Sequence, residues 1–292
     1  MILLVDKPAG MTSQRLVSQI KRAAGGKLKI GHTGTLDPMC TGLLPVLTGK
    51  DTKLTQFFPH TKAYLASIRF GIKTDTADVT GEIIERSSLP TESEFRAVLP
   101  SLVGKCEQVP PMYSAVHVDG KRLYELARQG VEVERQARPV EIFDLSFVDS
   151  VGDGEFRFSV TCSAGTYIRT LCEDLADRLG LCAAMSALRR TESNGFSLDG
   201  AHTLSEVLSA AEEGRLCDLS LTCEEAFAHL PTVVVPSNGE RFYCNGGVLT
   251  ANRLSGLGDD GLYRAYGESG AFLGLLSLSE GIAKAAFLNG EP

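Results

Sequence analysis

The segment GHTGTLDPMCTGLLPV, residues 31–46, is the most informative stretch of this sequence. Its glycines relieve backbone crowding, and Pro38 favours an extended conformation at the preceding Asp37. The apolar run from Leu43 to Leu47 would anchor such a loop to a core. The segment therefore predicts a rigid loop that presents the carboxylate of Asp37. The alternative is that Asp37 only caps a turn, which is the commoner role of an isolated Asp-Pro pair.

A second segment, CSAGTYIRTLCEDLADRLG at 162–180, offers a cation for that carboxylate. After Gly165 the apolar residues return at helical spacing, and Gly180 is a stop signal, so a helix is expected with Tyr167 and Arg169 in its first turn. A planar guanidinium can hold a carboxylate by two parallel hydrogen bonds. The residues are compatible with a pairing of Arg169 and Asp37, but spacing alone does not establish it.

Helix and strand patterns surround these two segments. Period-two alternation predicts strands, and apolar residues at spacings of three and four predict helices. A Ser13 cap, the Thr91 and Glu94 capping-box spacing, and a Gly-Asp-Gly turn at 152–154 mark boundaries. The expected elements are a helix over 14–24, a strand over 64–70, a helix from 91 that Pro100 interrupts, a hairpin of 140–148 with 156–162, acidic helices within 203–227 and a short strand over 232–235.

Composition places the chain among globular proteins. It has 292 residues, of which 43% are hydrophobic and 22% charged, which excludes collagenous, coiled-coil and wholly disordered chains. A chain of this length accommodates about two domains. Pro231 and Pro236 bracket the last short strand, so we expect a boundary near 230 and a small β domain after it.

The net charge of −7 is unevenly distributed. Residues 1–199 are neutral overall, and within them residues 1–36 carry six basic side chains against Asp6 alone: Lys7, Arg15, Lys21, Arg22, Lys27 and Lys29. A polyanion could dock on this local face although the whole chain is acidic. The alternative is an ordinary solvated helix face.

Several familiar sites are excluded by their missing motifs. The chain has no P-loop, HExxH, GxSxG or GxGxxG motif, and none of its eight cysteines forms a CxxC pair. The apolar start is too short for a signal peptide, and no run reaches the roughly 18 apolar residues of a membrane span. We therefore expect a cytoplasmic protein with reduced thiols, without a structural zinc and without a membrane association.

The sequence resembles the bacterial tRNA pseudouridine-55 synthases, the TruB type of pseudouridine synthase. The resemblance runs through most of the chain, in the family's order: LLVDKPAGMTS at 3–13, GHTGTLDPMCTG at 31–42, KAYLASIRFG at 62–71, TDTADVTG at 74–81, QVPPMYSAVHVDGKRLYELARQG at 108–130, CSAGTYIRTLCEDLADRLG at 162–180 and LRRTESNGF at 188–196. The last 60 residues match the family's PUA domain only loosely.

The resemblance implies an α+β fold: a mixed, mainly antiparallel sheet with flanking helices, followed by a small PUA-like β barrel. It implies a catalytic domain at 1–230 with an RNA-gripping insertion at about 105–138, and an RNA-binding domain at 231–292. It also implies isomerisation of uridine 55 in the T-stem-loop of tRNA to pseudouridine, by a monomer that uses no cofactor and no metal.

Residue roles follow from the same resemblance. It makes Asp37 the catalytic carboxylate, Arg169 its partner and Tyr64 the ring that stacks on the target base and helps to remove the C5 proton. His32 would occupy the place of the flipped base, and Tyr167 and Leu188 would line the same pocket. Lys7, Lys121 and Arg122 would also bind the substrate. Asp37 could attack C1′, add to the uracil ring or remove a sugar proton.

Two other classes of function use the same residues. One is an RNA-binding or tRNA-folding factor that does not turn over, although such an activity is compatible with catalysis. The other is an enzyme that acts on a small molecule through an aspartate nucleophile. The basic and aromatic residues interleaved in 108–130 favour RNA over a small molecule.

Overall fold

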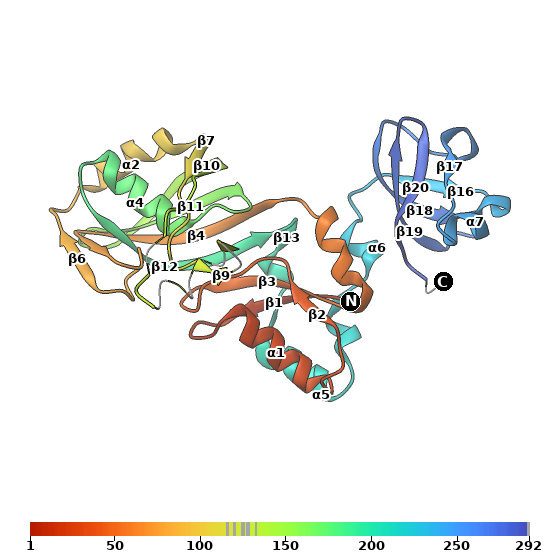
Figure 1. Cartoon of the computed structure of the whole chain (residues 1–292), viewed down its shortest axis with the longest axis horizontal. Coiled ribbons are helices and arrows are strands. Elements are labelled where there is room, and N and C mark those ends of the chain that lie inside the picture. The colour runs from red at the N-terminus through yellow and green to blue at the C-terminus, as the bar shows by residue number, and fades with distance from the viewer. Residues whose placement is uncertain (115–116, 119–120, 124–125, 127–128, 132, 291–292) are drawn as a thin grey trace.

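The computed structural model describes residues 1–114, 117–118, 121–123, 126, 129–131 and 133–290, and Figure 1 shows the arrangement. Two sheets organise the chain. The strands of the large sheet are β1 (Ile2–Lys7), β2 (Ile30–His32), β3 (Thr41–Thr48), β4 (Thr61–Phe70), β7 (Gly104–Gln108), β10 (Arg138–Gly152), β11 (Glu155–Ser163), β12 (Ala183–Ser193), β13 (Phe196–Ser197), β14 (His202–Thr203) and β15 (Ser220–Leu221).

The large sheet is mixed and mainly antiparallel. Its order is β14-β1-β3-β12-β4-β11-β10-β7, with β2, β13 and β15 paired at the side of this path. Only the pairs β1 with β14 and β3 with β12 are parallel. The α+β class expected from the sequence is thus confirmed. Strand β4 lies in the middle of the sheet between β12 and β11, so its side chains lie near the centre of the domain.

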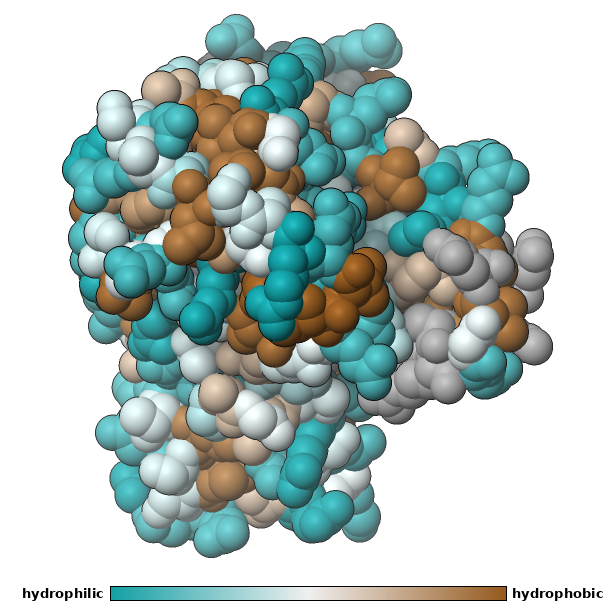
Figure 2. All heavy atoms as spheres, turned by 90° about the vertical axis from the view of Figure 1, so that its left-hand side faces the viewer, coloured by the Kyte–Doolittle hydropathy of each residue, from teal (hydrophilic) through white to brown (hydrophobic). Residues whose placement is uncertain are grey.

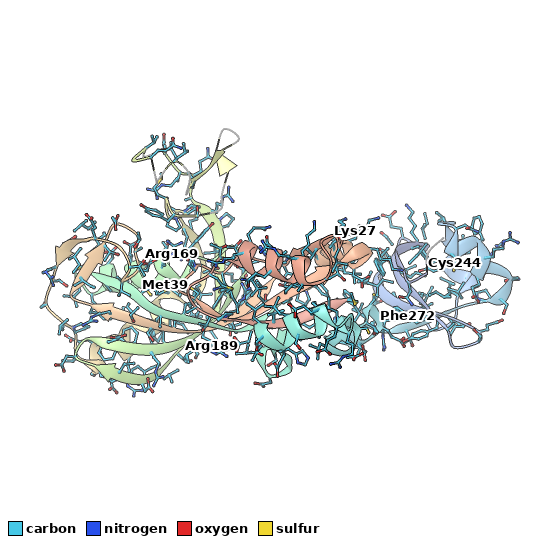
Figure 3. All side chains as sticks on the ribbon, turned by 90° about the horizontal axis from the view of Figure 1, so that it is seen from below. Lys27, Met39, Arg169, Arg189, Cys244 and Phe272 are labelled. Atoms are coloured by element: carbon cyan, nitrogen blue, oxygen red, sulfur yellow. The ribbon has the colours of Figure 1, made fainter. Side chains whose placement is uncertain are left out.

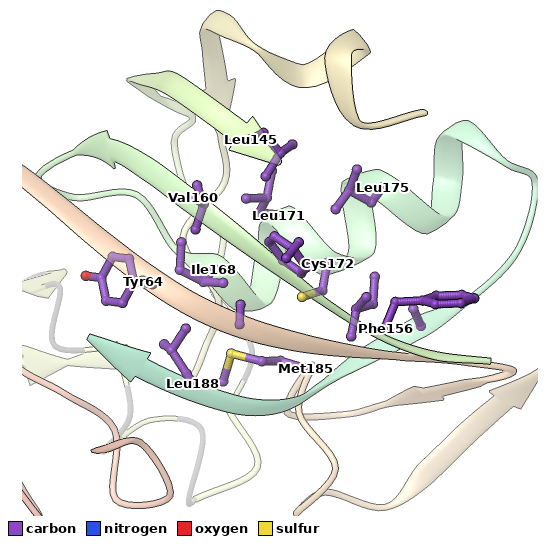
Figure 4. Close-up of a cluster of buried hydrophobic side chains, with 14 of the residues drawn as sticks. Tyr64, Leu145, Phe156, Val160, Ile168, Leu171, Cys172, Leu175, Met185 and Leu188 are labelled. Atoms are coloured by element: carbon purple, nitrogen blue, oxygen red, sulfur yellow. The ribbon is translucent and has the colours of Figure 1, made fainter. Parts of the chain in front are cut away.

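Helices flank this sheet. The α-helices of this domain are α1 (Ser13–Ala23), α2 (Glu92–Val98), α4 (Ile168–Arg178), α5 (Leu204–Glu212) and α6 (Cys223–Ala226) in the described residues, and 3₁₀ helices, the longest over Gly49–Phe57, lie between strands. Helix α4 lies over β4, β11 and β12, where its apolar face joins a core of aromatic and aliphatic side chains (Figure 4). Figure 4 places Tyr64 and Leu188 side by side at one end of that cluster, with the tyrosine oxygen directed away from it.

Local signals predicted these α-helices, with one wrong cap, but only β4, β10 and β11 among the strands of the large sheet. Thr12, and not Ser13, caps α1 by accepting a hydrogen bond from the amide of Arg15. The hydroxyl of Ser13 instead accepts from the amide of Leu36 at 2.8 Å and donates to the Leu36 carbonyl at 3.1 Å. Ser13 is buried and its helix packs against the loop that contains Leu36, so a distant backbone takes the hydroxyl.

The C-terminal sheet is a curled half-barrel, in keeping with a PUA-like domain (Figure 1). It runs β16-β18-β19-β20-β17, with β16 at Thr232–Val235, β17 at Leu249–Thr250, β18 at Gly261–Gly267, β19 at Phe272–Ser279 and β20 at Ile282–Leu288. Leu275 and Phe287 of this sheet belong to the same buried cluster as Leu54 and Phe58. The two sheets are therefore joined by apolar packing.

Helix α7 (Ser237–Cys244) was not expected from the sequence. It begins Ser-Asn-Gly, which favours turns over helices. Tyr243 near its end is completely buried, and its hydroxyl donates to the Leu275 carbonyl at 3.2 Å. Packing against the half-barrel thus stabilises a helix that propensity disfavours.

The surface is mixed in character. Figure 2 looks onto the end of the molecule that carries the hairpin of β5 (Ile72–Thr74) and β6 (Ile83–Arg86), and shows apolar side chains scattered among hydrophilic ones. Within the part of the chain that the structure describes, no helix combines the length and the apolar character needed to cross a membrane.

Candidate active site

One pocket collects five of the residues that the sequence singled out. It has a volume of about 250 Å³ and opens beside β4 and the start of α4. The predicted residues on its wall are Asp37, Tyr64, Tyr167, Arg169 and Leu188. The remaining wall is formed by Thr35, Leu36, Lys62, Ser114, Gly165, Thr166, Ile168 and Met185. The pocket is thus apolar on one side and charged where Asp37 and Arg169 meet.

The loop that presents Asp37 is fastened from three sides. Ser13 holds Leu36 from one side, as described above. From behind, the ammonium of Lys7 donates to the carbonyls of Met11 at 2.8 Å, Pro8 at 2.9 Å and Pro38 at 3.4 Å. Lys7 has no exposed surface, so its contacts are with the protein backbone.

Arg190 of β12 provides the third attachment, which the sequence analysis missed. It is fully buried, and its guanidinium donates to the carbonyls of Leu43 at 2.7 Å and Gly34 at 3.1 Å. The backbone of Arg190 also lies so close to Gly42, which has φ +103°, that a β-carbon there would overlap with it. A loop held in this way keeps its carboxylate in one direction, which lowers the entropic cost of catalysis.

Asp37 and Arg169 are paired inside the pocket. Nη2 of Arg169 lies 3.0 Å from Oδ2 of Asp37, and Arg169 is 5% exposed against 35% for the Asp37 side chain. The same nitrogen donates to the Tyr113 carbonyl at 2.7 Å, while Nη1 donates to the Thr76 carbonyl at 3.1 Å. The guanidinium is therefore shared among several acceptors, and the two-pronged pairing considered from the sequence is not formed.

Asp78 is a second carboxylate in this network. Its Oδ2 lies 4.0 Å from Nη1 of Arg169, and its Oδ1 accepts from the hydroxyl of Thr76 at 3.0 Å and the amide of Thr80 at 2.9 Å. The residue is buried. Asp78 lies in the TDTADVTG segment that carries the family resemblance, but no pattern in the sequence distinguished it from Asp75.

Opposing influences set the ionisation of Asp37. Burial is the largest and raises the pKa of its carboxyl above the ordinary value, and the negative charge of Asp78 acts in the same direction. The charge and hydrogen bond of Arg169, and the charge of Lys7, lower it. Arg169 therefore favours the ionised, reactive form of a carboxylate whose pKa burial raises.

Tyr64 faces the pocket from β4 and is nearly buried, at 7% exposure. Burial raises the pKa of its phenol to about 12, although Arg190 acts to lower it. At neutral pH the side chain is a neutral ring with one hydroxyl. Such a ring can stack on a base, and the hydroxyl can exchange protons with it.

The other predicted site residues lie near the pocket or outside the residues that the structure describes. His32 ends β2, and its Nδ1 accepts from the amide of Gly34 at 3.3 Å. Burial, Arg190 and Lys62 lower the pKa of His32, which favours a neutral imidazole. Lys121 and Arg122 form strand β9, but their side chains, with Tyr124 and Arg128, lie outside the described residues. Figure 3 shows Arg169 near the base of the described residues between β7 and β10, which stand out from the body.

No group of three or more His, Cys, Asp or Glu side chains comes together in the described ranges as a metal site would require. The charged residues on the pocket wall are Asp37, Lys62 and Arg169, with Asp78 behind Arg169. This set fits acid-base or nucleophilic chemistry carried out by side chains.

Comparison with known proteins gives this chemistry a class. A family model described as "TruB family pseudouridylate synthase (N terminal domain)" matches residues 21–168. A second model, described as "tRNA pseudouridylate synthase B C-terminal domain", matches residues 169–228. The fold is similar to a chain in the crystal structure of a Cbf5–Nop10–Gar1 complex, with a TM-score of 0.73 and 25% identity over 99% of this chain and 84% of that one. Fold and site define a pseudouridylate synthase, an isomerase.

Curated relatives agree with this class. A protein of Bacillus subtilis named tRNA pseudouridine synthase B is 41% identical over 94% of this chain and 91% of its own length. One of the same name from Aromatoleum aromaticum is 44% identical over 94% of this chain and 87% of its own. The chain belongs to the TruB family of pseudouridylate synthases.

Proposed function

We propose that this enzyme converts uridine 55 in the T-stem-loop of tRNA to pseudouridine, with Asp37 as its catalytic carboxylate. In this reaction the N1–C1′ bond breaks, the uracil turns, a C5–C1′ bond forms, C5 loses its proton and N1 gains one. The observation that carries the proposal is the contact of Asp37 with Arg169, 3.0 Å apart in a pocket of a TruB-family chain. Both curated relatives described above are named tRNA pseudouridine synthase B.

The other predicted residues take supporting roles in this proposal. Tyr64 stacks on the target base, Tyr167 and Leu188 line its pocket, and His32 props the space that the flipped base leaves. Lys121 and Arg122 grip the RNA. We assign Lys7 to holding the Asp37 loop and not to RNA contact, because its ammonium is buried against three carbonyls.

The proposal also covers the chain as a whole. Residues 1–230 form the catalytic domain, with the insertion at about 105–138, and residues 231–292 form an RNA-binding domain. The enzyme acts as a monomer in the cytoplasm. Sedimentation of the purified protein alone and with one equivalent of tRNA would test the monomer, with one copy of each in the complex as the expected result.

The test of function is release of tritium from tRNA that carries C5-tritiated uridine. We expect stoichiometric release of one tritium per tRNA, and none from a tRNA with cytidine at position 55. Tritium release from the tRNA with cytidine at position 55 would contradict the assignment of uridine 55 as the target. Binding without any release would support the alternative of an RNA-folding factor.

Replacement of Tyr64 by phenylalanine should separate stacking from proton transfer. The ring remains, so we expect RNA affinity within about twofold, while loss of the hydroxyl slows tritium release about 100-fold, the usual size of a general acid or base effect. Single-turnover release at saturating enzyme measures this. Tyr243→Phe, which removes a buried hydroxyl of the C-terminal domain, is the matched control and should leave the rate unchanged. Normal release by Tyr64→Phe would make Tyr64 a packing residue.

Binding should weaken as salt rises, despite the acidic total. Five basic side chains of the first 36 residues are exposed: Arg15, Lys21, Arg22, Lys27 and Lys29. Each phosphate contact contributes a slope of about 0.7–0.9 in a plot of log affinity against log salt. We expect Lys21→Gln with Arg22→Gln to lower that slope by about 1.5, measured by fluorescence titration. An unchanged slope would place the RNA on another face.

A further inference from the structure

Lys62 is a cation of the pocket wall that the proposed chemistry does not use. It lies in β4, two residues before Tyr64, and lines the same pocket as Asp37. Its Nζ reaches across to the turn before Asp37, where a β-carbon on Gly34 would overlap with it. The absence of a side chain at Gly34 therefore makes room for the ammonium at this place.

The neighbouring cations are all committed to partners in the protein. Lys7 and Arg190 donate to backbone carbonyls, and Arg169 is shared between Asp37 and two carbonyls. Lys62, in contrast, forms no hydrogen bond or ion pair with any residue that the structure describes. A half-buried ammonium without a counter-charge loses hydration without compensation, so a ligand that supplies the anion would gain from pairing with it.

The surroundings of Lys62 are basic. The groups that face it are the guanidinium of Arg190 on β12, the imidazole of His32 on β2 and the thiol of Cys162 on β11. Burial and the charge of Arg190 lower the pKa of Lys62 to about 8. The nearest charged neighbour of Lys62 is thus another cation, and no carboxylate of the described part forms an ion pair with it.

We propose that Lys62 binds a backbone phosphate next to the target uridine and so positions that nucleotide against Asp37. The inference rests on the proposed function. A flipped nucleotide brings its flanking phosphodiesters to the mouth of the pocket, and uracil itself is uncharged. Asp37 would repel such a phosphate, and Lys62 offsets that repulsion. A compact ammonium is suited to a phosphate as a point charge.

The experiment removes the positive charge of Lys62 in the enzyme, or the negative charge of one phosphate in the RNA. Single-turnover tritium release is measured against enzyme concentration with a T-stem-loop RNA and with RNAs that carry a neutral methylphosphonate at the linkage 5′ or 3′ of the target. On native RNA we expect Lys62→Met to raise the half-saturating concentration about tenfold. On the RNA that is neutral at the contacted linkage, Lys62→Met should raise it less than twofold. Lys53→Met changes an exposed lysine of the 3₁₀ helix over Gly49–Phe57, outside the insertion and the pocket; it is the matched control and should match wild type on every RNA.

The outcomes separate this inference from the proposed function. No release by the wild-type enzyme from native RNA would overturn both. Normal wild-type release with the same Lys62→Met defect on all three RNAs, or with no defect, would overturn the Lys62 assignment alone. Melting temperatures of the two variants identify any loss that comes from folding.

A pH series gives a second readout, which a purely structural lysine would not produce. A phosphate raises the pKa of Lys62, so the complex holds more protons than the free enzyme above pH 8 and affinity falls as pH rises. Lys62→Arg stays charged, so its half-saturating concentration should be flat between pH 7 and 9.5 and close to the wild-type value at pH 7. The pKa of Cys162, about 11, and the lowered pKa of His32 lie outside this window. Identical pH profiles for wild type and Lys62→Arg would overturn the assignment.

Discussion

Asp37→Asn should slow pseudouridine formation by about 10⁴-fold or more while RNA binding persists, because the amide keeps the shape of the side chain but cannot act as nucleophile or base. Stability should not fall. Burial raises the pKa of Asp37, so the ionised carboxylate costs folding free energy at neutral pH, and the uncharged amide removes that cost. Single-turnover tritium release, fluorescence titration with tRNA and a thermal melt measure the three quantities.

A matched control keeps this result specific to the pocket. Asp199→Asn makes the same chemical change on an exposed 3₁₀ turn and should behave as wild type in all three measurements. Tritium release by Asp37→Asn at a rate near wild type would show that another group performs the chemistry. A loss of rate together with a loss of melting temperature would point to a structural role.

Substitution of Arg169 should cause the second-largest loss of rate, and the size of the loss should depend on the residue that replaces it. Arg169→Lys keeps one charge but cannot reach Asp37 and the carbonyls of Thr76 and Tyr113 together, so orientation suffers and we expect a rate about 100-fold lower. Arg169→Met also removes the charge that lowers the pKa of Asp37. Its rate should fall about 10³-fold or more, and the acid limb of its pH–rate profile should move to higher pH, because more of Asp37 is protonated.

Stability is the control on this interpretation. The methionine variant leaves two carbonyls unpaired, which costs about 1–3 kcal/mol each when they are buried, so rates must be measured well below its melting temperature. Arg178→Met, in the last turn of the same helix, should affect neither rate nor melting. If Arg169→Lys and Arg169→Met turn over normally, or lose rate only with the folded fraction, Arg169 is structural.

Local chemistry made much of the fold predictable. Thr91 and Glu94 form the expected capping box of α2, and Pro100 ends its regular turns, with a 3₁₀ helix over Leu99–Leu102 in their place. The alternation from Tyr64 to Phe70 is a strand, and the Gly-Asp-Gly turn joins β10 to β11. These features depend on residues within a few positions of one another, so the sequence reveals them directly.

Only the tertiary structure showed which distant segments come together at the pocket. Tyr64 on β4 lies opposite Arg190 on β12, and only this pairing register brings a strand residue, the Asp37 loop and the start of α4 to one pocket. The same contacts turned Lys7 and Arg190 inward, although isolated basic residues in a sequence favour the surface. The sequence by itself determined the elements that local signals mark, and it pointed to Asp37 and Arg169 as candidates without establishing that they pair. The tertiary structure decided which cations donate to backbone carbonyls and which one, Lys62, faces the pocket. These contacts depend on distances between segments far apart in the chain, which no local pattern encodes.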